Sequence, residues 1–244
     1  MKVIIPAAGY ATRLYPLTMN KPKHLLDVKG KPIIEHIIKK IEELNAVDEI
    51  FIITNEKFYS NFKGWSKKFS SKVTIKIFND GTTSNDDRLG SIGDIKFVLD
   101  KTKLDDNLLV VAGDNLFNFS LKEVYDFFID KKTNINALYD IKSFEDARQL
   151  GVATINKEGK IIEFKEKPQF PKSTLVSPAI YLFPRHKVNL ISKYIKEDNN
   201  PDKIGYFMEW LLANDELYGY VYEEKWFDIG WPSSLDQARK EFKG

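Results

Sequence analysis

Residues 1–26 read MKVIIPAAGYATRLYPLTMNKPKHLL, and this opening stretch decides the fold. Residues 3–5 form a continuous apolar run, which is typical of a parallel strand covered on both faces. Small residues at 6–9 follow, and then two cations, Arg13 and Lys23, stand among prolines. Small residues let backbone N–H groups approach a polyphosphate, and the cations match its charge. On composition alone, the alternative is a tight strand-to-helix turn with two solvated cations.

The rest of the first half alternates strand and helix patterns. We expect strands at 49–54, 73–78 and 108–111 and helices at 32–44, 57–69 and 92–99. This alternation predicts a doubly wound α/β fold with a mostly parallel, Rossmann-like sheet, in which ligands bind at the carboxyl ends of the strands.

The second half has a different pattern, with shorter strands joined by turns. Strands are predicted at 137–141, 151–155, 161–165 and 177–183, and helices at 187–198 and 204–213. We therefore expect a smaller antiparallel portion in this half. No repeat or linker divides the chain, so the prediction is a single domain spanning 1–244.

Composition excludes several classes of protein. The 244 residues include 37 basic and 35 acidic side chains, a net charge of +2 that gives no electrostatic footprint for nucleic acid or an anionic membrane. The absence of cysteine excludes disulfides, thiolate catalysis and zinc–cysteine sites. Without a signal peptide or a membrane-spanning apolar run, the expected location is the cytoplasm.

Two familiar phosphate-binding motifs do not occur. No G-x-x-x-x-G-K-[ST] string is present, and G-x-G-x-x-G fails because Gly9 is followed by YATR. Residues 7–18, AAGYATRLYPLT, and 21–26, KPKHLL, instead resemble the signature of the sugar-1-phosphate nucleotidyltransferases. That signature reads A-A-G-x-G-[ST]-R-[LM]-x-P-L-T and then K-P-K-x-[LM]-[LV]. Ala11 stands where the family usually has a second glycine.

Two aspartates fit the metal site that this resemblance implies. Asp114 follows the predicted buried strand 108–111, and Asp228 lies in WFDIG at 226–230, which resembles the family's W-x-D-[IT]-G. Taken alone, Asp114 is also an ordinary turn former. Two carboxylates together with substrate phosphates are the usual ligands of Mg²⁺ in proteins, so Mg²⁺ is the expected cofactor.

Shorter matches extend the resemblance over most of the chain. Residues 89–95 resemble the turn beneath the base, 151–153 the family's G-V strand start, and 166–168 its E-K-P segment. The resemblance implies catalytic roles for Arg13, Lys23 and Lys167, nucleotide binding by Ala8, Gly9, Ala11, Thr12, Arg13, Asn79, Gly90 and Ser91, and acceptor binding by Gly151, Glu166 and Lys167.

The implied reaction transfers a nucleoside monophosphate from an NTP (UTP, dTTP or CTP) to a sugar-1-phosphate, giving an NDP-sugar and pyrophosphate. Residues 1–115 form the nucleotide half and 116–244 the acceptor half of the expected domain. Thymine or uracil is preferred by family frequency alone. We also expect a short form without the C-terminal β-helix domain of many relatives.

Two alternatives remain open from the sequence. Relatives of this superfamily also activate phosphocholine with CTP, and a non-catalytic relative could bind nucleotide as a regulatory subunit. Relatives form dimers or tetramers, but no residue here marks an interface, so a homo-oligomer is neither predicted nor excluded.

Overall fold

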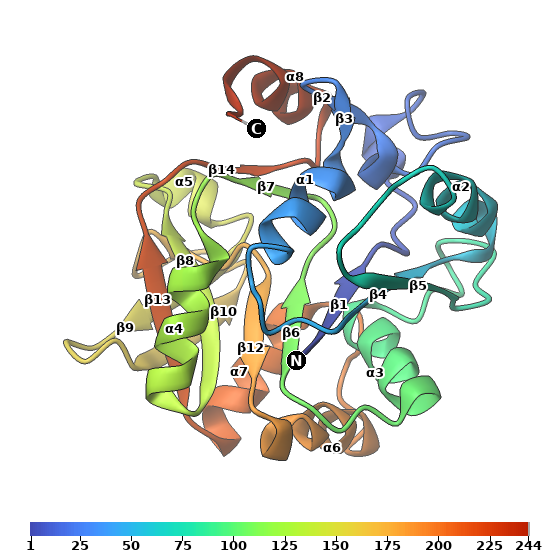
Figure 1. The fold of residues 1–244 in the computed structure, drawn as a ribbon. Helices are drawn as coiled ribbons and strands as arrows, with labels where there is room; N and C mark the ends of the chain where they lie inside the picture. Colours follow the sequence, from blue (N-terminus) through green and yellow to red (C-terminus); the bar gives the residue numbers. More distant parts are fainter. Residues whose placement is uncertain (244) are drawn as a thin grey trace.

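The computed structural model describes residues 1–243, which form one ten-stranded sheet with helices on both faces (Figure 1). The strand order is β10-β9-β11-β8-β12-β6-β1-β4-β5, and β13 pairs with β8 outside this path. Two small two-stranded sheets, β14-β7 and β2-β3, lie beside it.

The strands have the following bounds: β1 Lys2–Pro6, β2 Asp27–Val28, β3 Lys31–Pro32, β4 Glu49–Thr54, β5 Thr74–Asn79, β6 Leu108–Val111, β7 Asn115–Phe117, β8 Asn134–Asp140, β9 Gly151–Ile155, β10 Ile161–Glu166, β11 Leu175–Val176, β12 Ile180–Phe183, β13 Leu217–Tyr222 and β14 Trp226–Asp228. The α-helices are α1 Ile33–Ile41, α2 Glu56–Ser66, α3 Ser91–Thr102, α4 Leu121–Lys131, α5 Phe144–Ala147, α6 Asn189–Lys196, α7 Ile204–Asn214 and α8 Pro232–Glu241. Short 3₁₀ turns cover Thr12–Leu14, Lys23–Leu25 and Arg185–Lys187.

The direction of strand pairing changes between the two halves of the chain. β1 pairs in parallel with β4 and β6, and β4 in parallel with β5. β12 runs antiparallel to β6 and β8, and β9 antiparallel to β10 and β11. The expected parallel sheet with an antiparallel portion in the second half is therefore confirmed.

The continuous apolar run of β1 is explained by packing on both faces of the sheet. Val3 and Ile5 lie in a core cluster with residues of α1, α2, α4 and α8, whereas Ile4 faces a second cluster with residues of α3, α6 and α7. Alternate side chains of a strand point to opposite faces, so a strand between two helical layers is apolar at every position.

Several predicted boundaries are wrong. α1 ends at Ile41 rather than at 44, and the strand expected over 177–183 begins only at Ile180. Pro178 offers no N–H to a neighbouring strand, and Ala179 has a left-handed backbone with φ of 55°, so the extended ladder is interrupted there.

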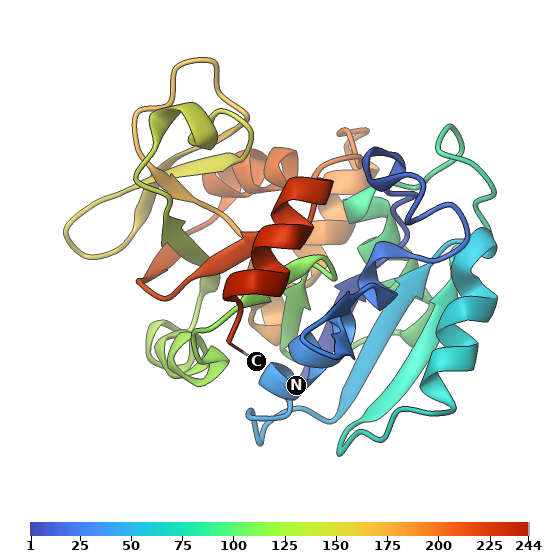
Figure 2. The same ribbon diagram turned by 90° about the horizontal axis from the view of Figure 1, so that it is seen from above.

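The last helix brings the end of the chain to its beginning. α8 packs against β2 and β14, beside the N-terminal segment (Figure 2). The Arg239 Nε donates a hydrogen bond to the Asp27 carbonyl oxygen at 3.1 Å. As a result β14, which carries Asp228, is held against the N-terminal half.

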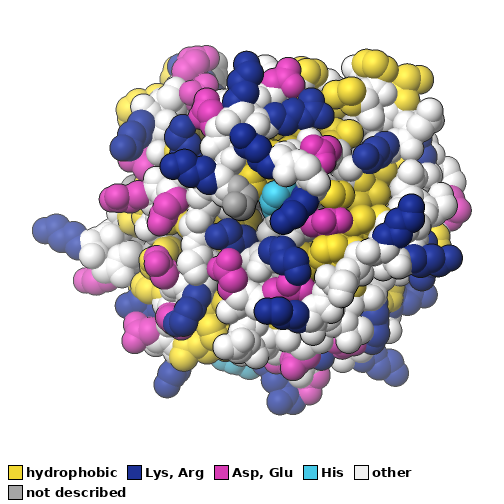
Figure 3. Space-filling model, turned by 45° about the horizontal axis from the view of Figure 1, so that its top comes forward, with side chains coloured by type: hydrophobic (Ala, Val, Ile, Leu, Met, Phe, Trp, Pro, Cys, Tyr) yellow, Lys and Arg dark blue, Asp and Glu magenta, His cyan; other side chains and the backbone are white. Residues whose placement is uncertain are grey.

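Charges of both signs alternate on the surface. On the face seen in Figure 3, Lys and Arg side chains are interspersed with Asp and Glu. This distribution agrees with the near-balanced composition. Among residues 1–243, no helix combines the length and the apolarity that a membrane crossing requires.

Candidate active site

The loop after β1 crosses the carboxyl ends of the parallel strands. The Ala7 N–H donates to the carbonyl of Ile53 at the end of β4 (2.8 Å), and the buried Asn55 Nδ2 donates to the Ala8 carbonyl (2.7 Å). The Gly113 N–H, beyond β6, donates to the Pro6 carbonyl (3.2 Å). Residues from three strands thus fix the small-residue loop at the edge where a doubly wound sheet binds ligands.

Close packing beneath this loop explains the glycine before Asp114. A Cβ at position 113 would lie 2.7 Å from His24 Cδ2 and 3.0 Å from the Pro6 carbonyl oxygen. The His24 ring is buried, and burial followed by the charge of Lys23 lowers its pKa to about 3. His24 is therefore neutral at physiological pH and fills space under the site.

Lys23 and Asp114 form an ion pair through Nζ and Oδ2. Both side chains are largely shielded, with exposed fractions of 15% and 26%. Burial acts to raise the pKa of the Asp114 carboxyl, but the Lys23 ammonium outweighs it and the net pKa lies below the usual value. The predicted lysine and the predicted metal carboxylate are thus in direct contact.

The second carboxylate reaches the same place from the C-terminal segment. β14 pairs with β7 so that Asp228 is opposite Asn115, and the Ile229 N–H donates to the Asp114 carbonyl at 3.1 Å. Burial and then the Asp114 charge raise the pKa of Asp228 to about 6, while Lys23, Lys167 and Arg13 act to lower it. Three cations and two carboxylates therefore share one electrostatic environment. The cations are Arg13, Lys23 and Lys167, and the carboxylates are Asp114 and Asp228.

These two aspartates are a donor set that suits a hard divalent cation. Among residues 1–243 the Asp228 carboxylate has no hydrogen-bond or ion-pair partner, and the residue is exposed. A cation there would compensate both carboxylates. No group of three or more His, Asp or Glu side chains suited to a metal occurs in the same described range, so substrate and water oxygens would complete the coordination.

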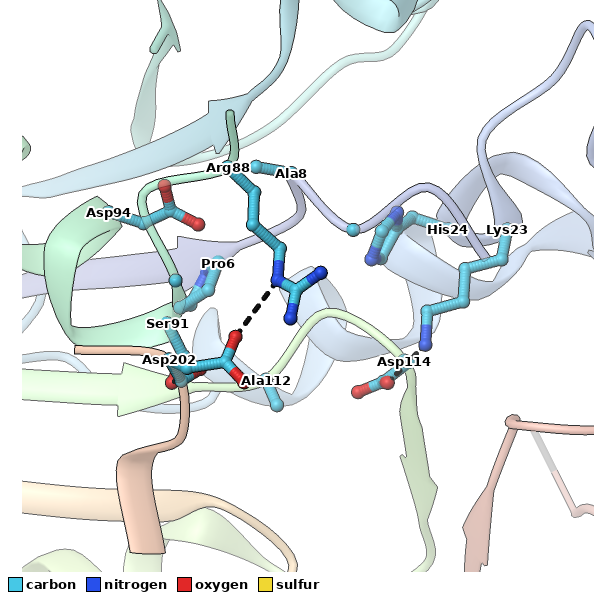
Figure 4. A pocket seen from close by; sticks show the side chains of 12 residues that line it. Pro6, Ala8, Lys23, His24, Arg88, Ser91, Asp94, Ala112, Asp114 and Asp202 are labelled. Carbon is cyan, nitrogen blue, oxygen red and sulfur yellow. Dashed lines mark hydrogen bonds and ion pairs between the residues drawn. The ribbon is translucent and has the colours of Figure 1, made fainter. Parts of the chain in front are cut away.

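A cavity of about 260 Å³ extends from the Lys23–Asp114 pair along the loop. In Figure 4 that pair lies on one side of the cavity, Asp94 on the other, and the Arg88–Asp202 ion pair (2.9 Å) between them. The lining residues are Pro6, Ala8, Gly9, Lys23, His24, Arg88, Gly90, Ser91, Asp94, Ala112, Asp114 and Asp202.

The turn at the start of α3 is built on Gly90. Its φ is +81°, and a Cβ would lie 2.5 Å from both the Cα of Asp202 and the carbonyl oxygen of Pro201. The N–H groups of Ser91 and Ile92 donate to the carbonyls of residues 202 and 201, each at 3.0 Å. The segment before α7 therefore satisfies the first donors of α3 and forms one wall of the cavity.

The structure brings only part of the predicted nucleotide set together. Ala8, Gly9, Gly90 and Ser91 line the cavity together with Lys23 and Asp114. Asn79 does not line the cavity. Its Nδ2 donates to Glu56 Oε2, and its Oδ1 accepts from the Gly81 N–H.

The remaining loop residues lie outside that cavity wall. Thr12 is exposed in a 3₁₀ turn, and Ala11 before it has a left-handed backbone with φ of 50°. Ala11 thus adopts the conformation for which a glycine is favoured. The Arg13 guanidinium lies over the Trp231 ring, 5.0 Å from its centroid.

The predicted acceptor residues lie together on the antiparallel part of the sheet. Gly151 is opposite Glu166 in the β9–β10 ladder. The Glu166 N–H donates to Glu209 Oε1 (2.8 Å), and the Lys167 N–H donates to the Leu150 carbonyl (3.0 Å). Burial raises the pKa of the Glu166 carboxyl.

A second cavity of about 480 Å³ borders Asp228, and none of the predicted acceptor residues Gly151, Glu166 and Lys167 is among its lining residues. Four aromatic residues, Tyr139, Trp226, Phe227 and Trp231, line it together with Asp146 and Gln149. This cavity and the first one flank the two aspartates, so two ligands could meet there.

Sequence reasoning missed the lining roles of Arg88, Asp94 and Asp202. Asp94 lies within the turn quoted for base recognition, but no spacing rule singles it out. Asp202 comes from a segment 108 residues further on, and nothing local to the sequence indicates that it contacts Arg88.

Comparison with known proteins fits this geometry. The profile of the Nucleotidyl transferase family matches residues 2–243. The chain belongs to that family.

Relatives of this nucleotidyl transferase are named for different activities. It is 32% identical over 244 residues to the "Bifunctional protein GlmU" of Methanocaldococcus jannaschii, covering 98% of the chain and 54% of that protein. It is 30% identical over 237 residues to a protein of Sulfolobus acidocaldarius described as a mannose-1-phosphate guanyltransferase, covering 95% and 60%. The chain thus spans little more than half the length of these curated relatives.

A solved structure confirms the nucleotidyl transferase fold over the whole chain. A Bacillus anthracis protein described as a glucose-1-phosphate thymidylyltransferase, in complex with sucrose, superposes with a TM-score of 0.83. It is 28% identical, and the match covers 100% of this chain and 97% of that one.

Proposed function

We propose that this chain transfers a nucleoside monophosphate from an NTP to a sugar-1-phosphate, releasing pyrophosphate. The observation that carries the proposal is the meeting of Asp114 and Asp228 beside Lys23. Asp114 and Asp228, more than 100 residues apart in the chain, lie between a cavity lined by the small-residue loop and a second, aromatic cavity, and Lys23 supplies the opposite charge. The relatives named for sugar-phosphate nucleotidyl transfer support the same reaction class.

In this reaction an oxygen of the sugar phosphate attacks the α-phosphorus of the NTP. The bond from the α-phosphorus to its bridging oxygen breaks, and pyrophosphate leaves with that oxygen. The attacking phosphate is already anionic, so no general base is needed. The protein has to align two anions and reduce their repulsion.

The positions of Lys23, Lys167 and Arg13 suit three different roles in neutralising the phosphates. Lys23 contacts Asp114 at the end of the nucleotide cavity and would neutralise the transferring phosphate. Lys167 acts electrostatically on Asp228 from the acceptor side and would hold the sugar phosphate. Arg13, exposed beside Trp231, would take charge on the departing pyrophosphate.

Asp114 and Asp228 would hold Mg²⁺, which supplies charge neutralisation at the α-phosphate and the attacking oxygen. The fit rests on Asp228, a carboxylate without a partner in the described chain, and on its closeness to Asp114. Ala8 and Gly9 leave room for phosphate oxygens near this pair.

The aromatic cavity beside Asp228 favours a second candidate substrate. Tyr139, Trp226 and Trp231 with Asp146 form aromatic and acidic walls, the chemistry that binds a quaternary ammonium. Phosphocholine is therefore an alternative acceptor for the same nucleotidyl transfer. Glu166 and Gly151 favour a sugar, because a carboxylate and nearby backbone groups suit hydroxyls.

Pyrophosphate release tests this function. Purified protein with Mg²⁺ would be given each NTP together with glucose-1-phosphate, mannose-1-phosphate, N-acetylglucosamine-1-phosphate or phosphocholine. We expect release with a sugar-1-phosphate and its loss in Asp114→Asn. Release only with phosphocholine would replace the sugar by the alternative acceptor. Nucleotide binding with no release from any pair would indicate a regulatory relative instead.

A further inference from the structure

The buried end of the nucleotide cavity holds a carboxyl group without a conventional partner. Asp94, on the first turn of α3, is 6% exposed and lines the cavity on the side away from Lys23 and Asp114 (Figure 4). No N–H or O–H group of residues 1–243 donates to its side chain, and Oδ1 is fully buried. Since the side chain lines the cavity and Oδ1 is enclosed, Oδ2 is the oxygen that reaches the cavity.

The group beside Asp94 is a second carboxyl. Asp80, just after β5, accepts from the Thr82 N–H (2.7 Å) and hydroxyl (2.8 Å) through Oδ1, whereas its Oδ2 is buried without a donor. The charges of these two carboxyls act on each other, and neighbouring buried carboxyls hold one proton between them rather than ionise together. Burial and then the Asp80 charge raise the pKa of Asp94, in agreement with such a pair.

The oxygen that faces the cavity is an acceptor when the shared proton lies on Asp80 or on the buried Oδ1 of Asp94. With the proton on Asp80, Asp94 is a carboxylate and Oδ2 accepts. With the proton on Oδ1 of Asp94, Oδ2 is the carbonyl oxygen and accepts again. A ligand that fills this end must bring a donor, because a buried acceptor left without one is costly.

The donors next to Asp94 are already used within the protein. The N–H groups of Ser91 and Ile92 donate to the carbonyls of Asp202 and Pro201, and the Ser91 hydroxyl donates to Asp202 as well (3.1 Å). The Thr82 hydroxyl donates to Asp80. These donors of the turn are therefore not available to the keto oxygens of a base, and elsewhere on the cavity wall Arg88 uses Nε on Asp202 and Nη1 on the Asn85 carbonyl.

We propose that Asp94 accepts a hydrogen bond from an exocyclic amino group of the base, so that the donor nucleotide carries cytosine, adenine or guanine. The inference rests on the proposed function for the identity of the ligand as an NTP. Cytosine, adenine and guanine each present an exocyclic NH₂ donor, whereas uracil and thymine present two keto oxygens flanking a single ring N–H. Uracil and thymine could reach Oδ2 only through that ring N–H, and their two keto oxygens would then need donors on both sides of it, where the Ser91, Ile92 and Thr82 donors are already used. The choice reverses the preference for thymine or uracil that family frequency alone suggests.

Equilibrium binding tests the proposal on the unmodified protein. Calorimetric titration with Mg²⁺ and each of CTP, GTP, ATP, UTP and dTTP, without an acceptor, should give a Kd at least about 10-fold lower for one amino-bearing nucleotide than for UTP and dTTP. This ranking needs no variant, so it decides the proposal even if a substitution at position 94 fails to fold.

Asp94→Asn then assigns the preference to this side chain. The amide keeps the size of the carboxyl but presents a donor, so we expect the favoured nucleotide to lose about 10- to 100-fold in affinity relative to UTP. Asp100→Asn makes the same chemical change on the exposed side of the same helix, where Asp100 pairs with Lys96, and should leave the ranking unchanged. Circular dichroism confirms that both variants are folded.

Three outcomes would overturn the proposal: UTP or dTTP binding most tightly, a ranking that survives Asp94→Asn, or no binding of any NTP. The proposed function is judged separately by pyrophosphate release. Turnover with UTP or dTTP as the favoured nucleotide would keep the transferase and refute the role of Asp94. An Asp94-dependent ranking without release from any acceptor would keep the base assignment and refute the transferase.

Discussion

The backbone N–H of Ile229 donates a hydrogen bond to the carbonyl oxygen of Asp114, with the two atoms 3.1 Å apart. This single contact fixes the strand that carries Asp228 beside the turn that carries Asp114. β7 and β14 continue the pairing, so the two carboxylates are positioned by backbone rather than by flexible side chains. Preorganised charges of this kind are effective where charge has to be neutralised during a reaction.

Replacing either aspartate should abolish most of the turnover. Asp114→Asn and Asp228→Asn keep the side-chain shape but remove the charge, and we expect kcat to fall by about 10²- to 10⁴-fold. Steady-state pyrophosphate release measures this. Asp236→Asn, an exposed change on α8, is the matched control and should retain wild-type kcat. Near-normal turnover in either site variant would contradict the roles of the aspartates.

Turnover should depend on the shape of the cation at position 13 as well as on its charge. Arg13→Ala is expected to lower kcat by about 10²-fold or more, and Arg13→Lys by less, because an ammonium keeps the charge but lacks the planar fork that matches phosphate oxygens. Arg185→Ala removes an exposed Arg–Asp pair and serves as the control. Equal activity of Arg13→Ala and Arg185→Ala would refute a role for Arg13.

Gly90→Ala should destabilise the protein. The substituted residue would keep a φ of +81° with its Cβ 2.5 Å from the backbone of Pro201 and Asp202, a strain of about 1–3 kcal/mol. A thermal melt should show a lower Tm. Gly64→Ala is the opposite case, since its Cβ meets nothing within 4 Å in the exposed part of α2, and it should stabilise by up to about 1 kcal/mol. An unchanged Tm in Gly90→Ala would show that the turn can relax.

The Asp80–Asp94 pair predicts how stability depends on pH. Burial and then the Asp80 charge raise the pKa of Asp94 in the folded protein to about 8, well above the value of about 4 that is usual for an aspartate. Between those values the folded state holds a proton that the unfolded state has lost, so stability falls as pH rises from about 4 to about 8 and then levels off.

Asp94→Asn removes this proton linkage. Between pH 5 and pH 8 the Tm of the variant should fall less than that of the wild type, by about 10 °C, because three pH units at about 1.4 kcal/mol each amount to about 4 kcal/mol and each kcal/mol shifts Tm by about 2–4 °C. Differential scanning calorimetry on the nucleotide-free protein measures both curves. Parallel curves for variant and wild type would show that Asp94 ionises normally.

The sequence was most informative where local chemistry determines the structure. The apolar runs at β1, β4 and β6 predicted buried parallel strands, and the residues after β1 and β6 predicted ligand-binding loops. Gly9, Lys23 and Asp114 could be identified because their motifs resemble the nucleotidyltransferase signature, and the structure places all three on the wall of one cavity.

Long-range contacts were beyond the reach of sequence patterns. α4, β13 and β14 were not predicted, although β13 forms a parallel ladder with β8 and β14 delivers Asp228. The contact of Asp202 with Arg88 and the pairing of Asp80 with Asp94 depend on how the loops fold over the sheet edge. The hydrophobic periodicity around Asp80, Arg88, Asp94 and Asp202 does not indicate which of these residues contact one another.

The most direct test of the central claim follows the α-phosphate. NTP labelled at the α-phosphorus would be incubated with protein, Mg²⁺ and a sugar-1-phosphate, and the products separated. The account predicts that the label leaves the NTP and appears in a nucleoside diphosphate sugar, with unlabelled pyrophosphate in equal amount, and that Asp228→Asn shows neither. Label that remains in the NTP, or appears in free nucleoside monophosphate whether or not the acceptor is present, would contradict nucleotidyl transfer.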